Sequence, residues 1–418
     1  MSIFADLLSN VFDRRYRFGL AREDDRPLSE LTADLVSTAG DVTGQAVARQ
    51  ILDRYAGWND DEKRAFFHHL ASEMDLDPEA VRSALDAYEV APGKASYRSF
   101  MAAVEPPRQE LIRRLNQVPG ATRLLVMMRS DLLRLGRDDD ALMALDIDFR
   151  HLFASWFNRG FLVLRPISWE SPAHILEKII AYEAVHAIDS WDDLRRRLQP
   201  ADRRCFAFFH PAVSDEPLIF VEVALTQGVP GSIQALLAEG RDPLPPEQAN
   251  TAVFYSISNC QSGLAGISFG NSLIKQVASD LSTELPGLKT FVTLSPIPGF
   301  ARWLADQHLP QETEDGTALR QLAAYYLTRA KRGNGKPLDP VASFHLGNGA
   351  LVHAVHADAD VSPKGRAQSH GVMVNYLYDL SRISQNHEKF ASDATIATSN
   401  ELRSLAQVGE TILKEAAQ

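Results

Sequence analysis

The chain has 418 residues, of which 45% are hydrophobic and 23% are charged, and its formal net charge is −11. A chain of this length is too long for one compact core, so two domains are expected, and the composition is that of an ordinary globular protein. The negative charge argues against a nucleic-acid-binding protein, which needs a basic surface to neutralise phosphates. The longest apolar runs, such as residues 217–225, are strand-sized and too short to span a membrane, so we expect no membrane partner.

The N-terminal sequence and the cysteines bear on the cellular compartment. The N-terminal sequence lacks the charged, apolar and small-residue order of a secretory signal. Arginines among residues 14–17 would suit a transit peptide, but Asp6 and Asp13 oppose that interpretation because transit peptides are poor in acids. Cys205 and Cys260 form no CxxC pattern, so they predict neither a disulfide framework nor a zinc site and are typical of a reducing compartment. We therefore expect a cytoplasmic protein.

Residues 1–158 have the pattern of consecutive helices. Asn59 followed by Glu62 matches a capping box, and Asp77 with the proline after it matches an N-cap and first helical turn. The segment 121–136 carries apolar residues on more than half of its circumference, so it should pack on two sides, in a bundle or at a subunit interface. We predict an N-terminal all-helical bundle.

From residue 159 the periodicity changes, which predicts a second domain, 159–418, built around a sheet. Helical patterns alternate with β-rich runs in the order β-α-α-β-β-β-loop-α-β-α-β, which is typical of an α/β sheet. The predicted strands are 161–169, 205–210, 218–225, 251–258, 289–295 and 350–357, and the predicted helices include 171–185, 190–199 and 271–285.

A glycine-rich loop, NCQSGLAGISFG, separates the strand 251–258 from the helix after it. Gly263, Gly266 and Gly270 allow positive φ angles and a close approach of the backbone to a ligand. Asn271 or Ser272 would cap the helix, whose free N–H groups could then bind a pyrophosphate. The spacing matches neither a Rossmann fingerprint nor a P-loop. A plain turn between strand and helix is the alternative, and the pattern alone leaves both open.

Two further segments suggest ligands less strongly. The basic stretch 329–336 could meet another phosphate, although such a run is more often a solvated loop. His353 and His356 would share a face on a helix, but the run 350–357 is predicted to be a strand, where they would point to opposite faces. We therefore predict no metal site.

Ser295 and His345 are the candidate catalytic residues. Ser295 ends the predicted strand 289–295 before a rigid Pro-Ile-Pro-Gly segment, and strand ends of an α/β sheet are where ligands bind. It is not in a GxSxG motif, so a hydrolase nucleophile is not expected. His345 precedes a Gly-Asn-Gly turn at a predicted strand entrance, where its pKa would suit acid–base catalysis. From spacing alone, a turn serine and a structural histidine are the favoured interpretations.

Several segments together resemble the signature segments of the malonyl-CoA decarboxylase family. They are FYSISNCQSGLAG, TLSPIPGF, FHLGNGA and ADVSPKGRAQSHGVMVNYLY, and the resemblance runs in the same order from about residue 110 to 380. It implies a helical N-terminal domain and a C-terminal mixed sheet with flanking helices of the acetyltransferase-superfamily type, with CoA pyrophosphate at loop 259–270. It also implies Ser295 and His345 as catalytic residues, and Ser256 and Tyr378 as residues lining the site.

The resemblance implies a lyase of fatty acid metabolism that converts malonyl-CoA to acetyl-CoA and CO2 without a cofactor or metal. It also implies a homo-oligomer, expected to be a tetramer, assembled through the helical domain. Ser268 departs from an acidic residue of a relative, and the short stretch between Phe300 and His345 favours a bacterial-type cytoplasmic enzyme. The alternatives are an acyl-CoA-dependent acyltransferase and a catalytically silent acyl-CoA-binding protein.

Overall fold

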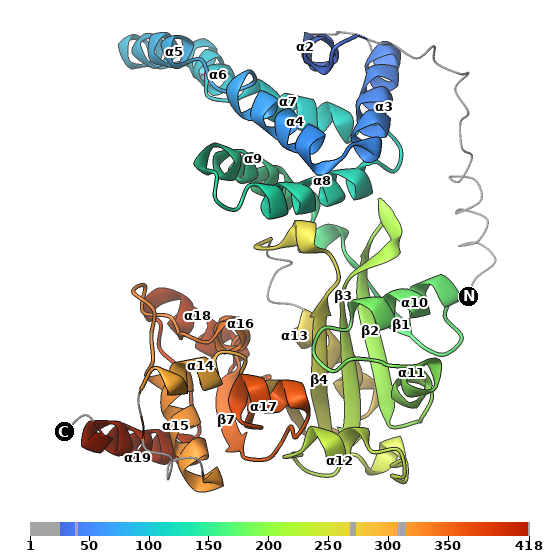
Figure 1. Cartoon of the computed structure of the whole chain (residues 1–418), viewed down its shortest axis with the longest axis vertical. Helices are drawn as coiled ribbons and strands as arrows, with labels where there is room; N and C mark the ends of the chain where they lie inside the picture. The colour runs from blue at the N-terminus through green and yellow to red at the C-terminus, as the bar shows by residue number, and fades with distance from the viewer. Residues whose placement is uncertain (1–25, 38–40, 268–272, 308, 310–314, 417–418) are drawn as a thin grey trace. The chain divides into compact units, whose positions relative to one another are not determined.

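The computed structural model describes residues 26–37, 41–267, 273–307, 309 and 315–416. The N-terminal segment considered as a transit peptide lies outside these residues, as do Ser268, Gly270, Asn271 and Ser272 of the glycine-rich loop. The chain divides into two compact units, Met1–Leu152 and Phe153–Gln418 (Figure 1). The division falls within helix α9 (Asp140–Trp156).

The N-terminal unit is helical throughout its described part, as predicted. The Asn59 side chain accepts hydrogen bonds from the N–H groups of Asp61 and Glu62, and the Glu62 carboxylate accepts one from the Asn59 N–H, so the predicted capping box is present. Asp77 caps the next helix through the N–H groups of Glu79 and Ala80. The helices before α9 are α2 (Leu28–Ser37), α3 (Asp41–Gly57), α4 (Asp60–Ser72), α5 (Pro78–Val90), α6 (Lys94–Ala103), α7 (Pro107–Leu115) and α8 (Ala121–Leu135).

Helix α8 is buried over a wide face, in keeping with its apolar pattern. Leu125, Met128 and Leu132 are fully buried. The same helix also buries Arg129, whose guanidinium donates to both carboxylate oxygens of Asp146 at 2.7 and 3.2 Å. Because a buried charge must be paired, this contact fixes how α8 meets α9.

The C-terminal unit is built around one mixed sheet. Strands β1 (Val163–Ile167), β2 (Arg203–His210), β3 (Val213–Thr226) and β4 (Thr251–Asn259) pair antiparallel in chain order. Strand β5 (Thr290–Thr293) is parallel to the first part of β4. Strand β8 (Met373–Leu377) pairs with β5, with β6 (Ser295–Pro296) and with β7 (Leu351–His356). The last described strand therefore lies inside the sheet and not at its edge.

Helices cover both faces of this sheet (Figure 1). Residues of α13 (Leu273–Glu284), α15 (Gly316–Thr328) and α16 (Pro340–Gly347) share a core with Val221, Phe254 and Phe291. Residues of α10 (Ala173–Tyr182) and α11 (Trp191–Leu198) pack with Ala207 and Phe220 on the other face. The remaining helices are α12 (Ile233–Leu237), α14 (Phe300–Ala305), α17 (Pro363–Ser369), α18 (Ile383–Asp393) and α19 (Asn400–Ala416). The predicted architecture, a helical unit followed by a mixed sheet with flanking helices, is confirmed, and its likeness to the acetyltransferase superfamily stays a prediction.

Strand β7 forms as predicted but contains an irregularity. Its register against β8 shifts between Val352 and Ala354, so that Val352 and Val355 are both buried. The strict alternation of side chains between the two faces therefore fails in β7. The predicted placement of His353 and His356 on opposite faces depended on that alternation and no longer follows. The described residues nevertheless contain no group of three His, Cys, Asp or Glu side chains that could hold a metal ion. None of the described helices is long and apolar enough to cross a membrane.

Candidate active site

Ser295 lies where the chain leaves one strand pairing and begins another. Strand β5 runs parallel to β4 as far as Thr293, and Ser295 pairs antiparallel with Val374 of β8. Pro296 follows it and has no N–H group with which to extend the ladder. The single strand predicted over 289–295 is therefore two strands, and Ser295 begins the second of them.

His345 lies in the last turn of helix α16, so the prediction of a strand entrance is wrong. Asp339 caps the start of this helix by accepting a hydrogen bond from the Ala342 N–H at 2.8 Å. Gly349 follows the helix with a φ of +86°, and a Cβ there would be 2.2 Å from the Ile383 carbonyl oxygen. The Gly-Asn-Gly sequence is thus the end of a helix, and its tight packing fixes the position of His345.

His345 is the centre of a buried chain of hydrogen bonds, here called the serine–histidine cluster. The Tyr378 hydroxyl is 2.8 Å from His345 Nδ1, and Nε2 is 3.3 Å from Ser295 Oγ. Ser295 Oγ donates in turn to Thr293 Oγ1 at 2.8 Å. One tautomer satisfies all these contacts: Tyr378 donates to Nδ1, and the Nε2–H group donates to Ser295. The structure thus brings together three predicted site residues, Ser295, His345 and Tyr378.

Burial controls the ionisation of this cluster. His345 is only 3% exposed, and burial lowers its pKa to about 3. Burial also raises the pKa of Tyr378 well above its usual range. The His345 ring stacks on Tyr376, with 4.5 Å between ring centroids. The imidazole is therefore uncharged at neutral pH, and the expectation of a pKa poised near neutrality is wrong for the free protein.

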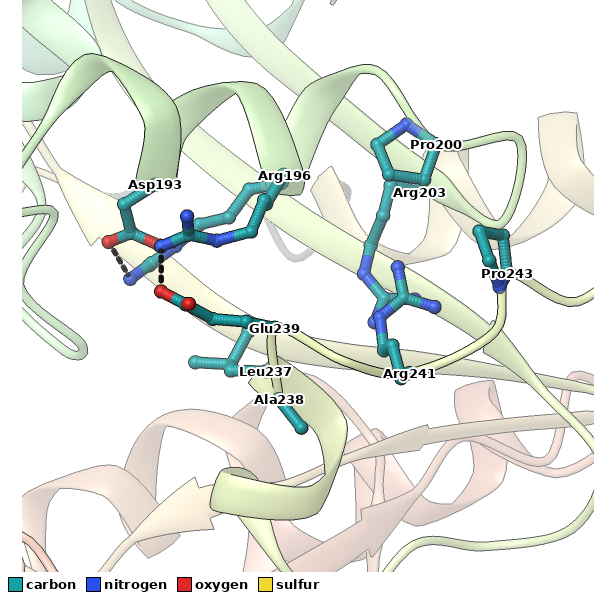
Figure 2. Close-up of a pocket in the computed structure, with 10 residues that line it drawn as sticks. Asp193, Arg196, Pro200, Arg203, Leu237, Ala238, Glu239, Arg241 and Pro243 are labelled. Carbon is teal, nitrogen blue, oxygen red and sulfur yellow. Dashed lines mark hydrogen bonds and ion pairs between the residues drawn. The ribbon is translucent and has the colours of Figure 1, made fainter.

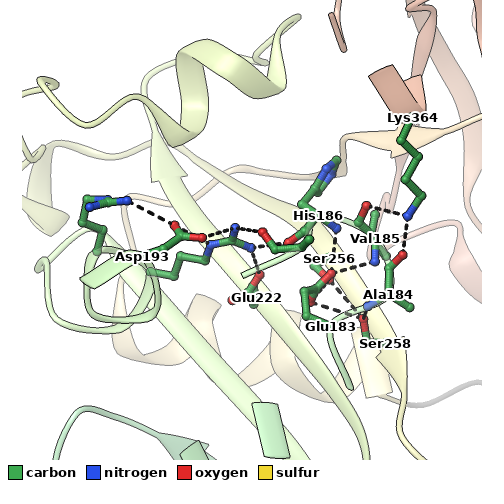
Figure 3. A network of polar contacts seen from close by, with 12 residues as sticks. Glu183, Ala184, Val185, His186, Asp193, Glu222, Ser256, Ser258 and Lys364 are labelled. Atoms are coloured by element: carbon green, nitrogen blue, oxygen red, sulfur yellow. Dashed lines mark hydrogen bonds and ion pairs between the residues drawn. The ribbon is translucent and has the colours of Figure 1, made fainter. Parts of the chain in front are cut away.

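Ser256 belongs to a different group of polar side chains, here called the glutamate–serine cluster (Figure 3). One carboxylate oxygen of Glu183 accepts from Ser256 Oγ at 2.7 Å and from Ser258 Oγ at 3.3 Å. The other oxygen accepts from the N–H groups of Val185 and His186, each at 2.8 Å. Four donors therefore hold this carboxylate and, through it, the Ser256 hydroxyl.

Glu222 lies directly opposite Ser256 in the register of β3 and β4. Its side chain is completely buried, and Oε2 is 3.4 Å from an Arg197 guanidinium nitrogen. Burial, reinforced by the nearby charge of Glu183, raises its pKa to about 8. Glu222 is therefore largely a neutral carboxylic acid at pH 7.

The two clusters face opposite sides of the sheet. Phe220, two residues before Glu222, packs with α10 and α11, whereas Tyr378 meets Phe254 edge to face in the core that includes α13 and α15. Because side chains alternate between faces along a strand, Ser256 points with Glu222 away from Tyr378. The place of Ser256 in one site with Ser295 stays a prediction.

The predicted order of strand, glycine-rich loop and helix is present. Strand β4 leads into a short 3₁₀ helix, η3 (Ser262–Leu264), and α13 follows. Gly266 has a φ of +73°, in keeping with the prediction, whereas Gly263 lies within η3 and is buried. The other two predicted residues of this loop lie outside the described chain, so its phosphate-binding role stays a prediction.

The basic stretch 329–336 forms a turn between α15 and α16. The Arg332 N–H donates to the Lys336 carbonyl at 2.8 Å, and the Arg332 guanidinium donates to the Leu338 carbonyl at 3.0 Å. Arg332 and Arg302 also line an open pocket of about 400 Å³. The turn is thus ordered by its own backbone, and contact with a phosphate stays a prediction.

Three polar residues of these clusters were missed by sequence reasoning. Glu222 interrupts the apolar run LIFVEVAL, and a lone carboxylate in such a strand must be paired or neutral once buried. Thr293 stands two residues before Ser295, a spacing that shares a face in extended chain. Both signals could have been used. Glu183 follows a helix and carried no comparable signal.

Two family models match the chain. The malonyl-CoA decarboxylase N-terminal domain matches residues 75–157, and the malonyl-CoA decarboxylase C-terminal domain matches residues 160–316 and 310–417. The chain belongs to the malonyl-CoA decarboxylase family. The predicted resemblance is thereby confirmed over most of the chain.

Solved and curated malonyl-CoA decarboxylases agree with this assignment. The crystal structures from Agrobacterium vitis and Rhodopseudomonas palustris are each 48% identical, with TM-scores of 0.85 and 0.84, and cover 90% of this chain and 98% of their own. The mitochondrial malonyl-CoA decarboxylase of Mus musculus is 30% identical over 97% of this chain and 91% of its own length. Both units of the chain therefore have counterparts in full-length family members.

Proposed function

We propose that this chain decarboxylates malonyl-CoA to acetyl-CoA and CO2, with Ser295 and His345 as catalytic residues. The observation that carries the assignment of roles is the buried contact of 3.3 Å between Ser295 Oγ and His345 Nε2 in a member of the malonyl-CoA decarboxylase family. The thioester carbonyl itself can accept the electrons of the breaking C–C bond as an enolate, so the reaction requires neither an organic cofactor nor a metal.

Ser295 orients the malonyl carboxylate in this mechanism. Its hydroxyl donates to Thr293 Oγ1 in the free protein, and rotation about the Cβ–Oγ bond would redirect the same hydrogen to a bound carboxylate. Thr293 Oγ1 would keep the hydrogen bond that it accepts from the Tyr376 N–H at 3.1 Å. The carboxylate can thus be held out of the plane of the thioester carbonyl without leaving a buried group unpaired.

His345 supplies the proton. The C–C bond breaks, CO2 leaves with the carboxylate oxygens, and the electron pair forms the acetyl-CoA enolate. The Nε2 proton of the neutral imidazole then passes to the enolate carbon, and the Tyr378 hydroxyl, 2.8 Å from Nδ1, gives its proton to Nδ1. Tyr378 regains a proton from solvent, which closes the proton balance.

Family membership supports the remaining site assignments. We assign the CoA pyrophosphate to the loop that contains Gly263, Gly266, Gly270 and Asn271, and Ser256 to the lining of the acyl-CoA site. The positive φ of Gly266 supports the first assignment, because only glycine adopts it without strain.

We further propose a cytoplasmic homo-oligomer, expected to be a tetramer, that associates through the N-terminal helices. Helices α5 and α6 support this proposal, because no described residue of either is buried. They expose large apolar side chains, including Val90, Tyr97 and Met101, and such surface is typical of an interface. Sedimentation of the purified chain would measure the oligomer size.

The reaction can be tested on the purified full chain with malonyl-CoA, without added metal or acyl acceptor, by measuring CO2 and acetyl-CoA together. Equal release of both products is expected. Ser295→Ala should reduce kcat roughly 10²–10³-fold, as for the loss of one positioned donor, and His345→Ala roughly 10²–10⁴-fold, as for the loss of a general acid. His353→Ala serves as the control and should retain activity.

Other outcomes would favour the alternatives. Acyl transfer to an added amine without CO2 would indicate an acyltransferase, and binding of malonyl-CoA without turnover would indicate a silent binding protein. A His345→Ala variant with full activity would exclude His345 as the acid, whereas an unchanged kcat of Ser295→Ala would exclude the serine.

A further inference from the structure

A small pocket lined by arginines lies beside helix α11 (Figure 2). It has a volume of about 110 Å³, several times the roughly 10–15 Å³ that a single water needs. A small tetrahedral anion with accompanying water would fit such a space. The arginines among its described lining residues are Arg196, Arg197, Arg203 and Arg241.

The two deepest arginines are held in place by backbone carbonyl groups. Arg203 is almost completely buried, and its guanidinium donates to the Leu236 carbonyl at 2.6 Å. Arg197 donates to the carbonyl groups of His186 and Ala187 at 2.8 and 2.9 Å. Since these contacts leave both guanidiniums fixed before any ligand arrives, little ordering cost would accompany binding.

One buried donor that lines the pocket has no acceptor among the described residues. It is Arg196 Nε. Buried polar groups are nearly always paired, so this unpaired donor indicates that an acceptor belongs in the pocket.

The charges around the pocket leave a positive surplus. Glu222, the acid next to Arg197, is largely neutral because burial raises its pKa to about 8. Burial and the nearby Arg241 guanidinium lower the pKa of Arg203, with burial the larger cause. Besides Glu222, the carboxylates that pair with the four guanidiniums are those of Asp193, Asp202 and Glu239. A bound anion would therefore offset an unfavourable concentration of positive charge, in a protein whose net charge is −11.

We propose that this pocket binds a phosphate group, either of free phosphate or of the 3′-phosphate of CoA. Arg196 and Arg241 supply guanidinium groups at the more exposed part of the pocket, and the fixed guanidinium of Arg203 supplies its floor. Arg197 contributes positive charge only, because its N–H groups already donate to Asp193, Glu222 and two backbone carbonyl groups. The planar guanidinium fork matches the oxygen spacing of a phosphate. The pocket lies on the α11 side of the sheet, away from the serine–histidine cluster, so free phosphate there would act as a stabilising or regulatory ligand.

The test is calorimetric titration of the full chain with inorganic phosphate at constant ionic strength. Arg196→Gln and Arg241→Gln each remove one lining guanidinium. Arg195→Gln is the matched control, because Arg195 is the neighbouring residue on α11, pairs with Asp192 at 3.1 Å and does not line the pocket. We expect saturable binding that the two pocket variants weaken at least tenfold and that Arg195→Gln leaves unchanged. Thermal unfolding without phosphate checks that each variant is folded. If Arg241→Gln does not fold, the comparison of Arg196→Gln with Arg195→Gln still tests the proposal.

Absence of saturable phosphate binding, or equal weakening by all three substitutions, would overturn the proposal. Competition identifies the source of the phosphate group. Displacement of phosphate by CoA but not by 3′-dephospho-CoA would assign the pocket to the 3′-phosphate, and displacement by neither would assign it to free phosphate. Displacement by both would place phosphate in the acyl-CoA site itself and would also overturn the proposal.

Discussion

The Tyr378 hydroxyl contacts His345 Nδ1 at 2.8 Å, on the side of the ring opposite Ser295. Tyr376, two residues earlier on β8, stacks its ring on the same imidazole, but its hydroxyl has no hydrogen-bond partner among the described residues. Two neighbouring tyrosines thus differ in one respect: only one hydroxyl sets the tautomer of His345.

This difference predicts opposite results for two matched substitutions. Tyr378→Phe removes the donor to Nδ1 and should lower kcat about tenfold to a hundredfold, because the tautomer and the replacement proton are both lost. Tyr376→Phe removes a hydroxyl that makes no described contact, so activity should be retained and stability unchanged or raised. Steady-state CO2 release from both variants gives the comparison. Equal activities would show that the contact with Nδ1 has no catalytic role.

Stability should depend on pH through His345. Its folded pKa is about 3, and that of an unfolded histidine is about 6.5. Below pH 6.5 the unfolded chain binds a proton that the folded chain does not, so this histidine makes stability fall as the pH falls from about 6.5 towards 3, by at most about 1.4 kcal/mol per pH unit. In urea unfolding, His345→Gln should lose this dependence, so its stability relative to wild type should rise in acid. A pH-independent difference would contradict the low pKa.

Glu183→Gln should destabilise the fold. The carboxylate accepts four hydrogen bonds, and a glutamine replaces one acceptor oxygen by an amide group that faces those donors. The expected loss is about 1–3 kcal/mol in the free energy of unfolding, the cost of buried donors left unpaired. Glu177→Gln, an exposed change on the preceding helix α10, should stay within about 0.5 kcal/mol. Urea unfolding of both variants at pH 7 measures the difference, which should vanish if the cluster contributes nothing.

Gly349 and Gly335 have similar backbone angles but different surroundings. Substituting each by alanine therefore separates the cost of backbone strain from the cost of a steric clash. Gly349 and Gly335 have φ angles of +86° and +79°. A Cβ at Gly335 would be 3.6 Å from its nearest neighbour, whereas one at Gly349 would be 2.2 Å from the Ile383 carbonyl oxygen. Gly335→Ala should therefore cost only the roughly 1–2 kcal/mol of a left-handed residue. Gly349→Ala should cost more and also lower kcat, since it displaces the end of α16. Similar unfolding energies for both variants would contradict this packing.

Much of the fold could be predicted because its signals are local. The capping box at Asn59 and Glu62 depends on residues within one turn, and each of the strands β2 to β4 contains a largely apolar run. Helix α16 was misjudged because it is short and followed by glycines, which also suit a turn into a strand. Strand β8 was missed by pattern because its five residues include the polar Asn375, whose side chain is paired only through tertiary contacts. These are with the carbonyl groups of Pro230 and Thr293 and with His356 Nε2.

The site itself could not be predicted from local pattern. Ser295 and His345 are 50 positions apart, and their contact requires β8 to enter the sheet beside β5. The resemblance to a family supplied the pair, while the structure supplied Thr293 as its further member. The ionisation of His345 could not be predicted either, because it depends on complete burial and not on neighbours in sequence.

The position of β8 in the sheet has a consequence for biosynthesis. Because this strand is the last described one and pairs with β5, β6 and β7, an unpaired edge of β5 persists on the ribosome until residue 377 has emerged. Unpaired strand edges promote aggregation, so the nascent chain is vulnerable until nearly all of it has been made. A chain truncated before Met373 would lose Tyr378 and the cover of β5 together, and quality control should remove it before it could accumulate as an inactive subunit.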